Sequence, residues 1–231
     1  MSRLSIIIPV LNEAAGIGQT LEALAAFRTR GVEVIVVDGG SQDDTVARAR
    51  PLADQVISAP RGRAAQMNAG AAKASGDVLL FLHADTMLPE DADGLMLYGL
   101  ADTGRVWGRF DVTIDGSNPT LKLVAGLMNW RSQITGIATG DQAMFLTRNA
   151  FFDVGGFPDI ALMEDIALSK RLKQIGRPIC LAARARTSGR RWREHGVIRT
   201  ILLMWRLRFA YWLGAEPAAL ARRYRTASRD S

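Results

Sequence analysis

The chain has 231 residues, of which 48% are hydrophobic and 23% are charged, proportions ordinary for a soluble globular protein. This length is sufficient for one large α/β domain with a proper core. A single cysteine, Cys180, excludes an internal disulfide and a four-thiolate metal site.

The positive charge is concentrated near the C-terminus. The whole chain carries +6, but residues 184–231 contain 12 Arg, no Lys and 3 acids, a net charge of +9, which leaves −3 for residues 1–183. Such a segment suits anionic lipid, a diphosphate or nucleic acid, and it equally suits a solvated helix surface. The first apolar run is too short for a signal peptide, and no uncharged run reaches the roughly 18–20 residues of a spanning helix. The sequence therefore favours a cytoplasmic protein.

The first part of the chain alternates between strand and helix patterns. Strands are expected at residues 5–10, 32–38, 55–60 and 77–85, and helices at 13–28, before Pro51 and at 63–75. Asn12 is expected to cap the first helix, and Gly31 and Gly76 to stop the first and third. This alternation predicts βαβ units and a doubly wound, mostly parallel sheet.

The pattern changes after Pro89. Helices are expected up to about Leu100, at 119–134 and at 163–176, and strands at 105–115, 140–148 and 177–184. The alternation in residues 105–115 predicts an antiparallel strand with one exposed face. We expect one catalytic domain over residues 1–184, with a nucleotide-binding half (1–88) and an acceptor half (89–184). Residues 185–231 would form an Arg-rich helical tail.

Acidic residues follow three of the expected strands. Glu13, Asp38 and Asp85 should meet at one edge of the sheet, where open parallel sheets bind ligands. The chain has no G-x-G-x-x-G turn after its first strand and no Walker A sequence, so no glycine loop holds phosphates. A metal ion on Asp85 is the alternative way to neutralise a diphosphate, and Asp38 could accept hydrogen bonds from a base or ribose.

A family resemblance rests on an ordered set of motifs: "SIIIPVLNE", "VVDGGSQDDT", "RAAQMNAGA", "FLHADT", "GDQAMF" and "MEDIALSKRLKQIG". Together they resemble the inverting family 2 glycosyltransferases, from Ser5 to about Arg184. The resemblance implies the glycosyltransferase A fold, a nucleotide-diphospho-sugar donor and a divalent cation, Mg²⁺ or Mn²⁺.

The donor-side residues that the resemblance implies are Pro9, Glu13, Asp38, Arg63, Asp85 and Arg191. Asp38 would hold the uracil or other base, and Asp85 would bind the metal. "HAD" stands in place of the family's D-x-D motif, so His83 replaces its first carboxylate. His83 would then be a neighbour of the metal site or an ordinary residue at the end of a strand.

The acceptor-side residues that the resemblance implies are Gly140, Asp141 and Trp192. "MED" matches the family's E-D motif at the start of a helix, where Asp165, or else Glu164, would deprotonate the acceptor hydroxyl. The alternative is that both acids only complement the helix dipole. Transfer would proceed in one step, with inversion.

The segment "TSGRRWREHG" lies where processive members of the family carry Q-x-x-R-W. Arg191 and Trp192 match, but Ser188 stands in place of Gln, which favours transfer of a single sugar over polymerisation. Arg190 or Arg191 could meet the diphosphate. His195 could complete the metal shell, or it could be structural.

The following segment, "VIRTILLMWRLRFAYWLG", is apolar but is interrupted by arginines. Arg199 and Arg206 share a helical face, and Trp205, Tyr211 and Trp212 are residue types common at membrane interfaces. One interpretation is a helix on the inner face of the cell membrane, assisted by the basic run from 222 to 225, which meets a lipid acceptor such as a polyprenol or carotenoid. The other is a helix that covers the domain or pairs two subunits as a homodimer.

Two functions from other classes are the alternatives to a glycosyltransferase. A nucleotidyltransferase would need a glycine-rich triphosphate loop after the first strand, which "PVLNE" does not supply. A non-catalytic nucleotide- or anion-binding protein would not need Asp38, Asp85 and Asp165 together. No motif predicts nucleic-acid binding.

Overall fold

The computed structural model describes residues 3–227, except for the side chains of Arg191, His195, Arg225, Thr226 and Ala227. The strands are β1 (Leu4–Val10), β2 (Glu33–Asp38), β3 (Gln55–Ser58), β4 (Val78–Phe81), β5 (Thr86–Met87), β6 (Trp107–Ile114), β7 (Met144–Thr147) and β8 (Ile179–Thr187). The helices are α1 (Ile17–Ala23), α2 (Ala25–Thr29), α3 (Thr45–Ala49), α4 (Arg63–Lys73), α5 (Ala92–Thr103), α6 (Pro119–Thr135), the short 3₁₀ helix η1 (Gly140–Gln142), α7 (Arg148–Asp153), α8 (Glu164–Ile175), α9 (Arg190–His195), α10 (Val197–Trp212) and α11 (Pro217–Ala227).

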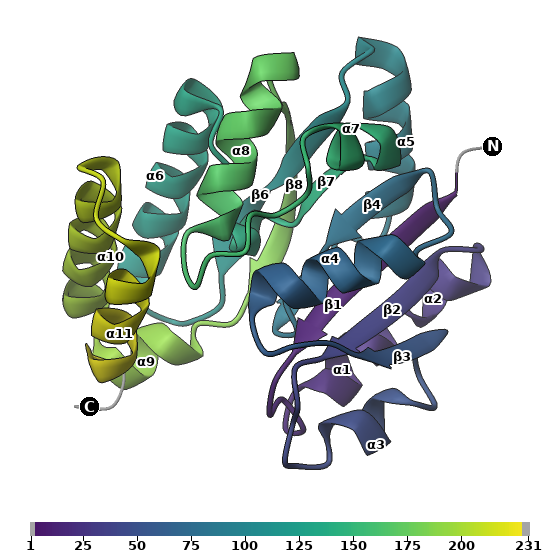
Figure 1. The fold of residues 1–231 in the computed structure, drawn as a ribbon, viewed down its shortest axis with the longest axis horizontal. Helices are drawn as coiled ribbons and strands as arrows, with labels where there is room; N and C mark the ends of the chain where they lie inside the picture. The colour runs from purple at the N-terminus through teal and green to yellow at the C-terminus, as the bar shows by residue number, and fades with distance from the viewer. Residues whose placement is uncertain (1–2, 228–231) are drawn as a thin grey trace.

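All of these strands belong to one sheet, in the order β3-β2-β1-β4-β7-β6-β8-β5 (Figure 1). The pairs β2–β3, β1–β2, β1–β4 and β6–β8 are parallel, and β4–β7, β6–β7 and β5–β8 are antiparallel. The predicted α/β fold with a mostly parallel sheet is therefore confirmed. Each antiparallel pair includes at least one strand that follows β4 in the chain.

Helices cover both faces of the sheet, which explains the unbroken apolar strands. On β1, Ile6 and Ile8 pack with α1, α2, α3 and α5, whereas Ile7 packs with α4, α7 and α8. All three isoleucines are fully buried. A strand that is buried on both faces needs apolar residues at successive positions, as β1 and β2 have.

The antiparallel strand β7 brings the two halves of the chain to one edge of the sheet. Phe81, at the end of β4, pairs with Met144, at the start of β7. β6 then runs back antiparallel to β7, and β8 runs parallel to β6. The ends of β1, β4, β6 and β8 and the start of β7 therefore meet at the same edge.

Three local predictions were wrong. Asn12 does not cap a helix; it has φ 55°, and its side chain accepts a hydrogen bond from the Gln42 N–H, while α1 begins after Gly16. The expected single helix over 13–28 is divided at Leu24. β6 pairs antiparallel with β7 as expected, but it has no exposed face in its first half because residues 107–110 are all buried.

The C-terminal segment forms α9, α10 and α11, which lie beside α6 and the start of α8 (Figure 1). Leu207 and Leu220 pack with Met163 and Ile166, so this segment shares a small core with α8. β8 continues to Thr187, past the boundary drawn at residue 184. Within residues 3–227, no helix combines the length and apolar character needed to cross a membrane.

Candidate functional site

A cleft of about 1010 Å³ opens at the edge of the sheet where the strand ends meet. The predicted site residues that line it are Pro9, Glu13, Arg63, Asp85, Gly140, Asp141, Glu164, Asp165 and Trp192. They come from both halves of the chain, since the start of β7 lies beside the ends of β1 and β4. The side chains of Arg191 and His195, which the sequence also proposed, lie outside the described residues.

Asp38 is the predicted site residue that does not line the cleft. It is 5% exposed, and its carboxylate accepts hydrogen bonds from the N–H groups of Gly40 (3.0 Å) and Ser41 (3.1 and 3.2 Å). These bonds shape the glycine turn after β2. In this structure Asp38 therefore supports the turn, and its predicted contact with a base stays a prediction.

The same turn after β2 also holds the backbone segment that follows β1. The Asn12 N–H donates to Ser41 Oγ at 2.9 Å, and the Glu13 N–H donates to Thr45 Oγ1 at 2.8 Å. The Ala14 N–H donates to an oxygen of Asp43 at 3.2 Å. The polar residues of "GGSQDDT" thus fix the backbone that presents Glu13 to the cleft.

Glu13 lies between an arginine and another acid. Its carboxylate is 3.6 Å from the Arg190 guanidinium. Burial raises the pKa of Glu13 above its ordinary value, Arg190 opposes that rise, and the nearby Asp85 carboxylate adds to it. Because Arg190 offsets the charge of Glu13, Asp85 is the acid at this end of the cleft that has no ion-pair partner among the described residues, which suits a cation.

A second arginine and acid pair lies at the start of α8. Glu164 is 4% exposed, and its carboxylate is 3.7 Å from the guanidinium of Arg63, which opens α4. Burial and then the neighbouring Asp165 raise the pKa of Glu164, while Arg63 lowers it. Burial lowers the pKa of Arg63, but Glu164 and more distant acidic groups raise it further, so Arg63 stays a cation.

Asp165 is held by the backbone on both sides. One of its carboxylate oxygens accepts from the Gly140 N–H at 2.9 Å, and the other accepts from the Ile166 N–H at 2.7 Å. His83 lies against the same turn, with its Nδ1 3.2 Å from Asp141. A Cβ atom on Gly140 would overlap the His83 ring, so only glycine allows this approach. His83 is therefore part of the packing around Asp165.

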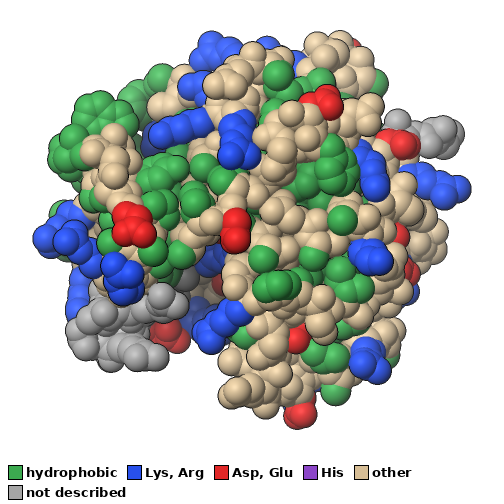
Figure 2. Space-filling model, viewed as in Figure 1, with side chains coloured by type: hydrophobic (Ala, Val, Ile, Leu, Met, Phe, Trp, Pro, Cys, Tyr) green, Lys and Arg blue, Asp and Glu red, His purple; other side chains and the backbone are tan. Residues whose placement is uncertain are grey.

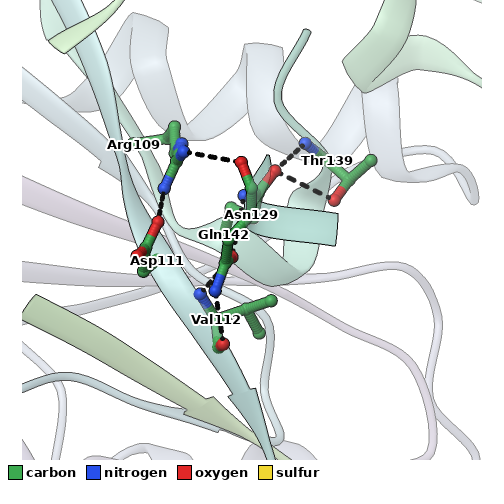
Figure 3. A network of polar contacts seen from close by, with 6 residues as sticks. All are labelled: Arg109, Asp111, Val112, Asn129, Thr139 and Gln142. Carbon is green, nitrogen blue, oxygen red and sulfur yellow. Dashed lines mark hydrogen bonds and ion pairs between the residues drawn. The ribbon is translucent and has the colours of Figure 1, made fainter. Parts of the chain in front are cut away.

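A polar network holds the turn that contains Gly140 and Asp141 (Figure 3). Asn129 of α6 pairs with the backbone of Val112 through bonds of 2.8 and 3.0 Å, and it accepts from Gln142 at 3.4 Å. Gln142 accepts from the Thr139 N–H at 3.2 Å. Buried Arg109 donates to the Asn129 carbonyl and pairs with Asp111. α6, β6 and η1 are thereby fixed to one another below the cleft.

Among the described residues, three other than glycine have positive φ angles: Asn12 (55°), Ala143 (45°) and Met163 (69°). Asn12 precedes the cleft-lining Glu13, Met163 itself lines the cleft, and Ala143 lies two positions after Asp141, which also lines it. Left-handed backbone costs a residue with a side chain about 1–2 kcal/mol. Strain of this kind gathers at functional sites, where the fold must impose a particular direction on the chain.

Sequence reasoning missed several groups on the cleft wall. Arg131 of α6 and Arg208 of α10 both line it, as does Tyr224 of α11. Nε and Nη2 of Arg131 are buried and have no hydrogen-bond partner among the described residues. The available signal was an arginine at the end of an apolar helical pattern, in "LMNWRSQI" and in "LLMWRLR".

The acidic side chains of the cleft are candidate ligands for a divalent cation. No group of three His, Cys, Asp or Glu side chains in the described part of the chain could hold a metal ion. Asp85 lines the cleft, and its carboxylate makes no hydrogen bond or ion pair with a described residue. One carboxylate with phosphate oxygens and water is a ligand set that Mg²⁺ accepts. The residues therefore fit a cation that is bound largely through a substrate.

The model of the family "Glycosyl transferase family 2" matches residues 5–156. The chain belongs to this family. The match spans β1 to α7 and includes the segments that carry Pro9, Glu13, Asp85, Gly140 and Asp141. It favours a glycosyltransferase over the nucleotidyltransferase and the non-catalytic binding protein.

Known proteins agree with this placement. The chain is 28% identical over 204 residues to the probable glycosyltransferase YdaM of Bacillus subtilis (strain 168), covering 76% of this chain and 48% of YdaM. It therefore spans about half the length of this curated relative.

Two solved structures share the fold. A mannosyltransferase from Pyrobaculum calidifontis, PcManGT, in complex with GDP-Man and Mn²⁺, has a TM-score of 0.65 at 22% identity, covering 96% of this chain and 68% of its own. S. aureus TarS 1-349, in complex with UDP-GlcNAc, has a TM-score of 0.65 at 18% identity, covering 80% and 58%. The predicted glycosyltransferase A fold is confirmed.

Proposed function

We propose that this family 2 glycosyltransferase moves one sugar from a nucleotide-diphospho-sugar to an acceptor, with inversion and with Asp165 as the base. The observation that carries the proposal is the fixed Asp165 carboxylate, which lies in the same cleft as the arginines and Asp85. Two backbone N–H groups hold Asp165 without neutralising it, so a carboxylate oxygen can still accept a proton from an acceptor hydroxyl.

In this mechanism the acceptor oxygen loses its proton to Asp165 and attacks the anomeric carbon from the face opposite the diphosphate. The bond between that carbon and the diphosphate oxygen breaks, and the nucleoside diphosphate leaves with the electron pair. An acceptor carboxylate would need no base. Arg63 and Arg190 line the cleft beside their acids and offer positive charge to the leaving group.

The donor-side residues fit this assignment: Asp85, together with phosphate oxygens, would hold Mg²⁺ or Mn²⁺, which would supply charge stabilisation to the leaving diphosphate. Glu13 supports the same end of the cleft through Arg190. The roles of Pro9, Asp38, Arg191 and His195 in donor or metal binding are kept as predictions. PcManGT and TarS, which share the fold, bind GDP-Man and UDP-GlcNAc respectively, so both bases are candidates.

The first test is a thermal-shift panel of UDP, GDP and their sugars, with and without Mn²⁺. We expect one nucleotide to raise Tm only with the metal, and the rise to vanish in Asp85→Ala but not in Glu90→Ala, an exposed acid nearby. No rise with any nucleotide would contradict the proposal. The anomeric proton of the product, followed by NMR, then reports inversion or retention.

We also propose that the cleft opens toward a membrane surface, where a lipid acceptor such as a polyprenol or carotenoid would reside. α6 exposes Leu123, Leu127, Trp130 and Ile134 along one face, and α10 exposes Ile198, Leu202, Trp205, Phe209 and Trp212 along another. Figure 2 shows hydrophobic side chains gathered at the left of the view, where α6 and α10 lie, with basic side chains at their border. Contiguous exposed apolar side chains of this kind mark interaction sites.

Charge favours anionic lipid over a second copy of the chain as the proposed occupant. Arg199 and Arg206 are exposed on α10 beside its apolar stripe, and Trp130 and Trp205 are residue types that favour membrane interfaces. We expect the protein to float with anionic vesicles at low salt, and Trp205→Glu to abolish flotation. A lipid-free dimer that Trp205→Glu dissociates would instead assign this face to a homodimer.

A further inference from the structure

The four arginines that line the cleft among the described residues fall into two kinds. Arg63 and Arg190 each have an acid partner, Glu164 and Glu13. The side chains of Arg131 and Arg208 form neither an ion pair nor a hydrogen bond with any described residue. The unpaired arginines come from α6 and α10, so they lie on the opposite wall from α4 and β1.

Arg131 is the more constrained of the two. Its Nε and Nη2 are buried without a hydrogen-bond partner, although the residue lines the cleft. Burial, followed by the positive charge of Arg208, lowers the pKa of Arg131 to about 10. A buried N–H without a hydrogen-bond partner destabilises the protein, and the repulsion between two guanidinium groups adds to that cost. Such an arrangement suits a ligand that supplies the missing acceptors.

The nearest described acid does not fill that role. Asp165 raises the pKa of Arg131, which places it in the same electrostatic neighbourhood, but it makes no ion pair with Arg131. Its two oxygens already accept from the Gly140 and Ile166 N–H groups. The two guanidinium groups therefore line the cleft beside the proposed base without an ion pair to any acid among the described residues.

We propose that Arg131 and Arg208 form an anion-binding subsite for a phosphate group of the acceptor. Two guanidinium groups present paired N–H donors that match phosphate oxygens, and a phosphate monoester carries about −1.5 to −2 charges at pH 7, enough to balance both. The assignment of this phosphate to the sugar acceptor rests on the proposed transfer function, because the subsite adjoins the proposed base, Asp165. Anion binding itself does not depend on that function.

The phosphate has two possible sources, a soluble phosphate ester or a lipid headgroup. Leu127, Trp130, Met204 and Trp205 line the same cleft, so a phosphate in the subsite would have apolar surface beside it. Inorganic phosphate serves as the soluble probe. Vesicles with phosphatidic acid serve as the lipid probe, and vesicles with phosphatidylglycerol, a phosphodiester of the same sign, control for surface charge alone.

The experiment compares wild type, Arg131→Met, Arg208→Met and the exposed control Arg50→Met. For a soluble source, inorganic phosphate raises Tm in wild type and Arg50→Met, and apparent affinity falls at least tenfold in the two cleft variants. For a lipid source, the preference for phosphatidic acid over phosphatidylglycerol is lost at least tenfold in the same two variants. Either pattern supports the subsite.

Two results would overturn the subsite: no effect of either probe on wild type, or equal effects in wild type and both cleft variants. If Arg131→Met does not fold, Arg208→Met and Arg131→Lys, which keeps the charge, carry the comparison. The nucleotide panel is run on the same proteins. A phosphate response without a nucleotide response would retain the subsite and reject the transferase proposal, and the reverse would reject only the subsite.

Discussion

The two halves of the molecule that meet at the cleft are built differently. From β1 to β4, parallel strands, of which β1, β2 and β4 are buried on both faces, end in turns whose polar side chains are engaged with the backbone, as Asp38 and Asp43 are. From α6 to α11, antiparallel pairing, two strained residues and unpaired arginines surround Asp165. The polar groups of the first half are mostly hydrogen-bonded within the fold, whereas the second half contains polar groups without hydrogen-bond partners and exposed apolar helix faces.

This difference indicates where binding free energy remains available. In the β1–β4 half the cleft-lining Glu13 and Arg63 are already paired, with Arg190 and Glu164, so a nucleotide-sugar must displace or extend existing pairs. In the α6–α11 half the Arg131 side chain has buried N–H groups without hydrogen-bond acceptors, and the Asp165 carboxylate can still accept a further hydrogen bond. Substitutions there should alter transfer more than they alter nucleotide binding, and the following predictions test that separation.

The largest effect is expected from Asp165→Asn. Loss of the base should reduce the rate of transfer about 10²–10⁴-fold, while the nucleotide-dependent rise in Tm is retained. Release of nucleoside diphosphate, with the nucleotide-sugar that the thermal panel selects, measures the rate. Asp159→Asn, an exposed acid in the loop before α8, is the matched control. If nucleotide binding and transfer fell together, the two halves would not be separable.

Gly140→Ala should destabilise the fold by about 1–3 kcal/mol, because the added methyl group would overlap the His83 ring. Urea unfolding measures the cost. In a His83→Ala background the same substitution should cost less than half as much, which isolates the contact between the two residues. Equal costs in both backgrounds would show that His83 does not restrict position 140.

The stability of the α8 start should depend on pH through Glu164. Because burial and Asp165 raise its pKa in the folded state, the folded protein binds more protons than the unfolded chain between the ordinary value of 4.5 and the raised one. The free energy of unfolding therefore falls as pH rises through that window, by about 1.4 kcal/mol for each pKa unit of the shift.

Glu164→Gln removes this loss. Relative to wild type, we expect the variant to gain stability at pH 8 compared with pH 4, as followed by Tm across that range. Asp159→Asn provides the baseline for an exposed acid on the same segment. A constant difference between Glu164→Gln and wild type at all pH values would contradict the raised pKa.

The smallest effect is expected at Ala143. Glycine there would lose a buried methyl group, worth about 0.8 kcal/mol, but it would relieve a left-handed conformation that costs about 1–2 kcal/mol. Ala143→Gly should therefore change stability by less than about 1 kcal/mol in either direction. Ala71→Gly, at an equally buried position within α4, should cost more because no strain is relieved. Equal losses at the two positions would argue against strain at 143.

Sequence reasoning performed well where one physical rule decides the outcome. The central residues of β1 (6–8) and β2 (34–37) are apolar at successive positions because both faces are covered, and that pattern can be recognised from the sequence alone. The edge that carries Glu13 and Asp85 follows from parallel pairing. The order of motifs was enough to identify the family, and the matching model extends over residues 5–156.

It failed where tertiary contacts override local preference. Asn is a residue type that commonly caps helices, yet the hydrogen bond from the Gln42 N–H holds Asn12 in a left-handed conformation. The alternation in β6 suggested an exposed face, but β7 and β8 flank a strand whose first half is fully covered. Arg131 and Arg208 are 77 positions apart, so only the packing of α10 beside α6 brings them to one wall.

The distribution of tryptophan has a practical consequence. Of the five tryptophans, Trp130, Trp192 and Trp205 line the cleft, all in the half that follows β4, and Trp107 is fully buried below it. No tryptophan lies between β1 and β4. Intrinsic fluorescence is thus a built-in optical reporter of the α6–α10 wall: an amphiphile that settles there should shift the emission to the blue, without any label having been attached.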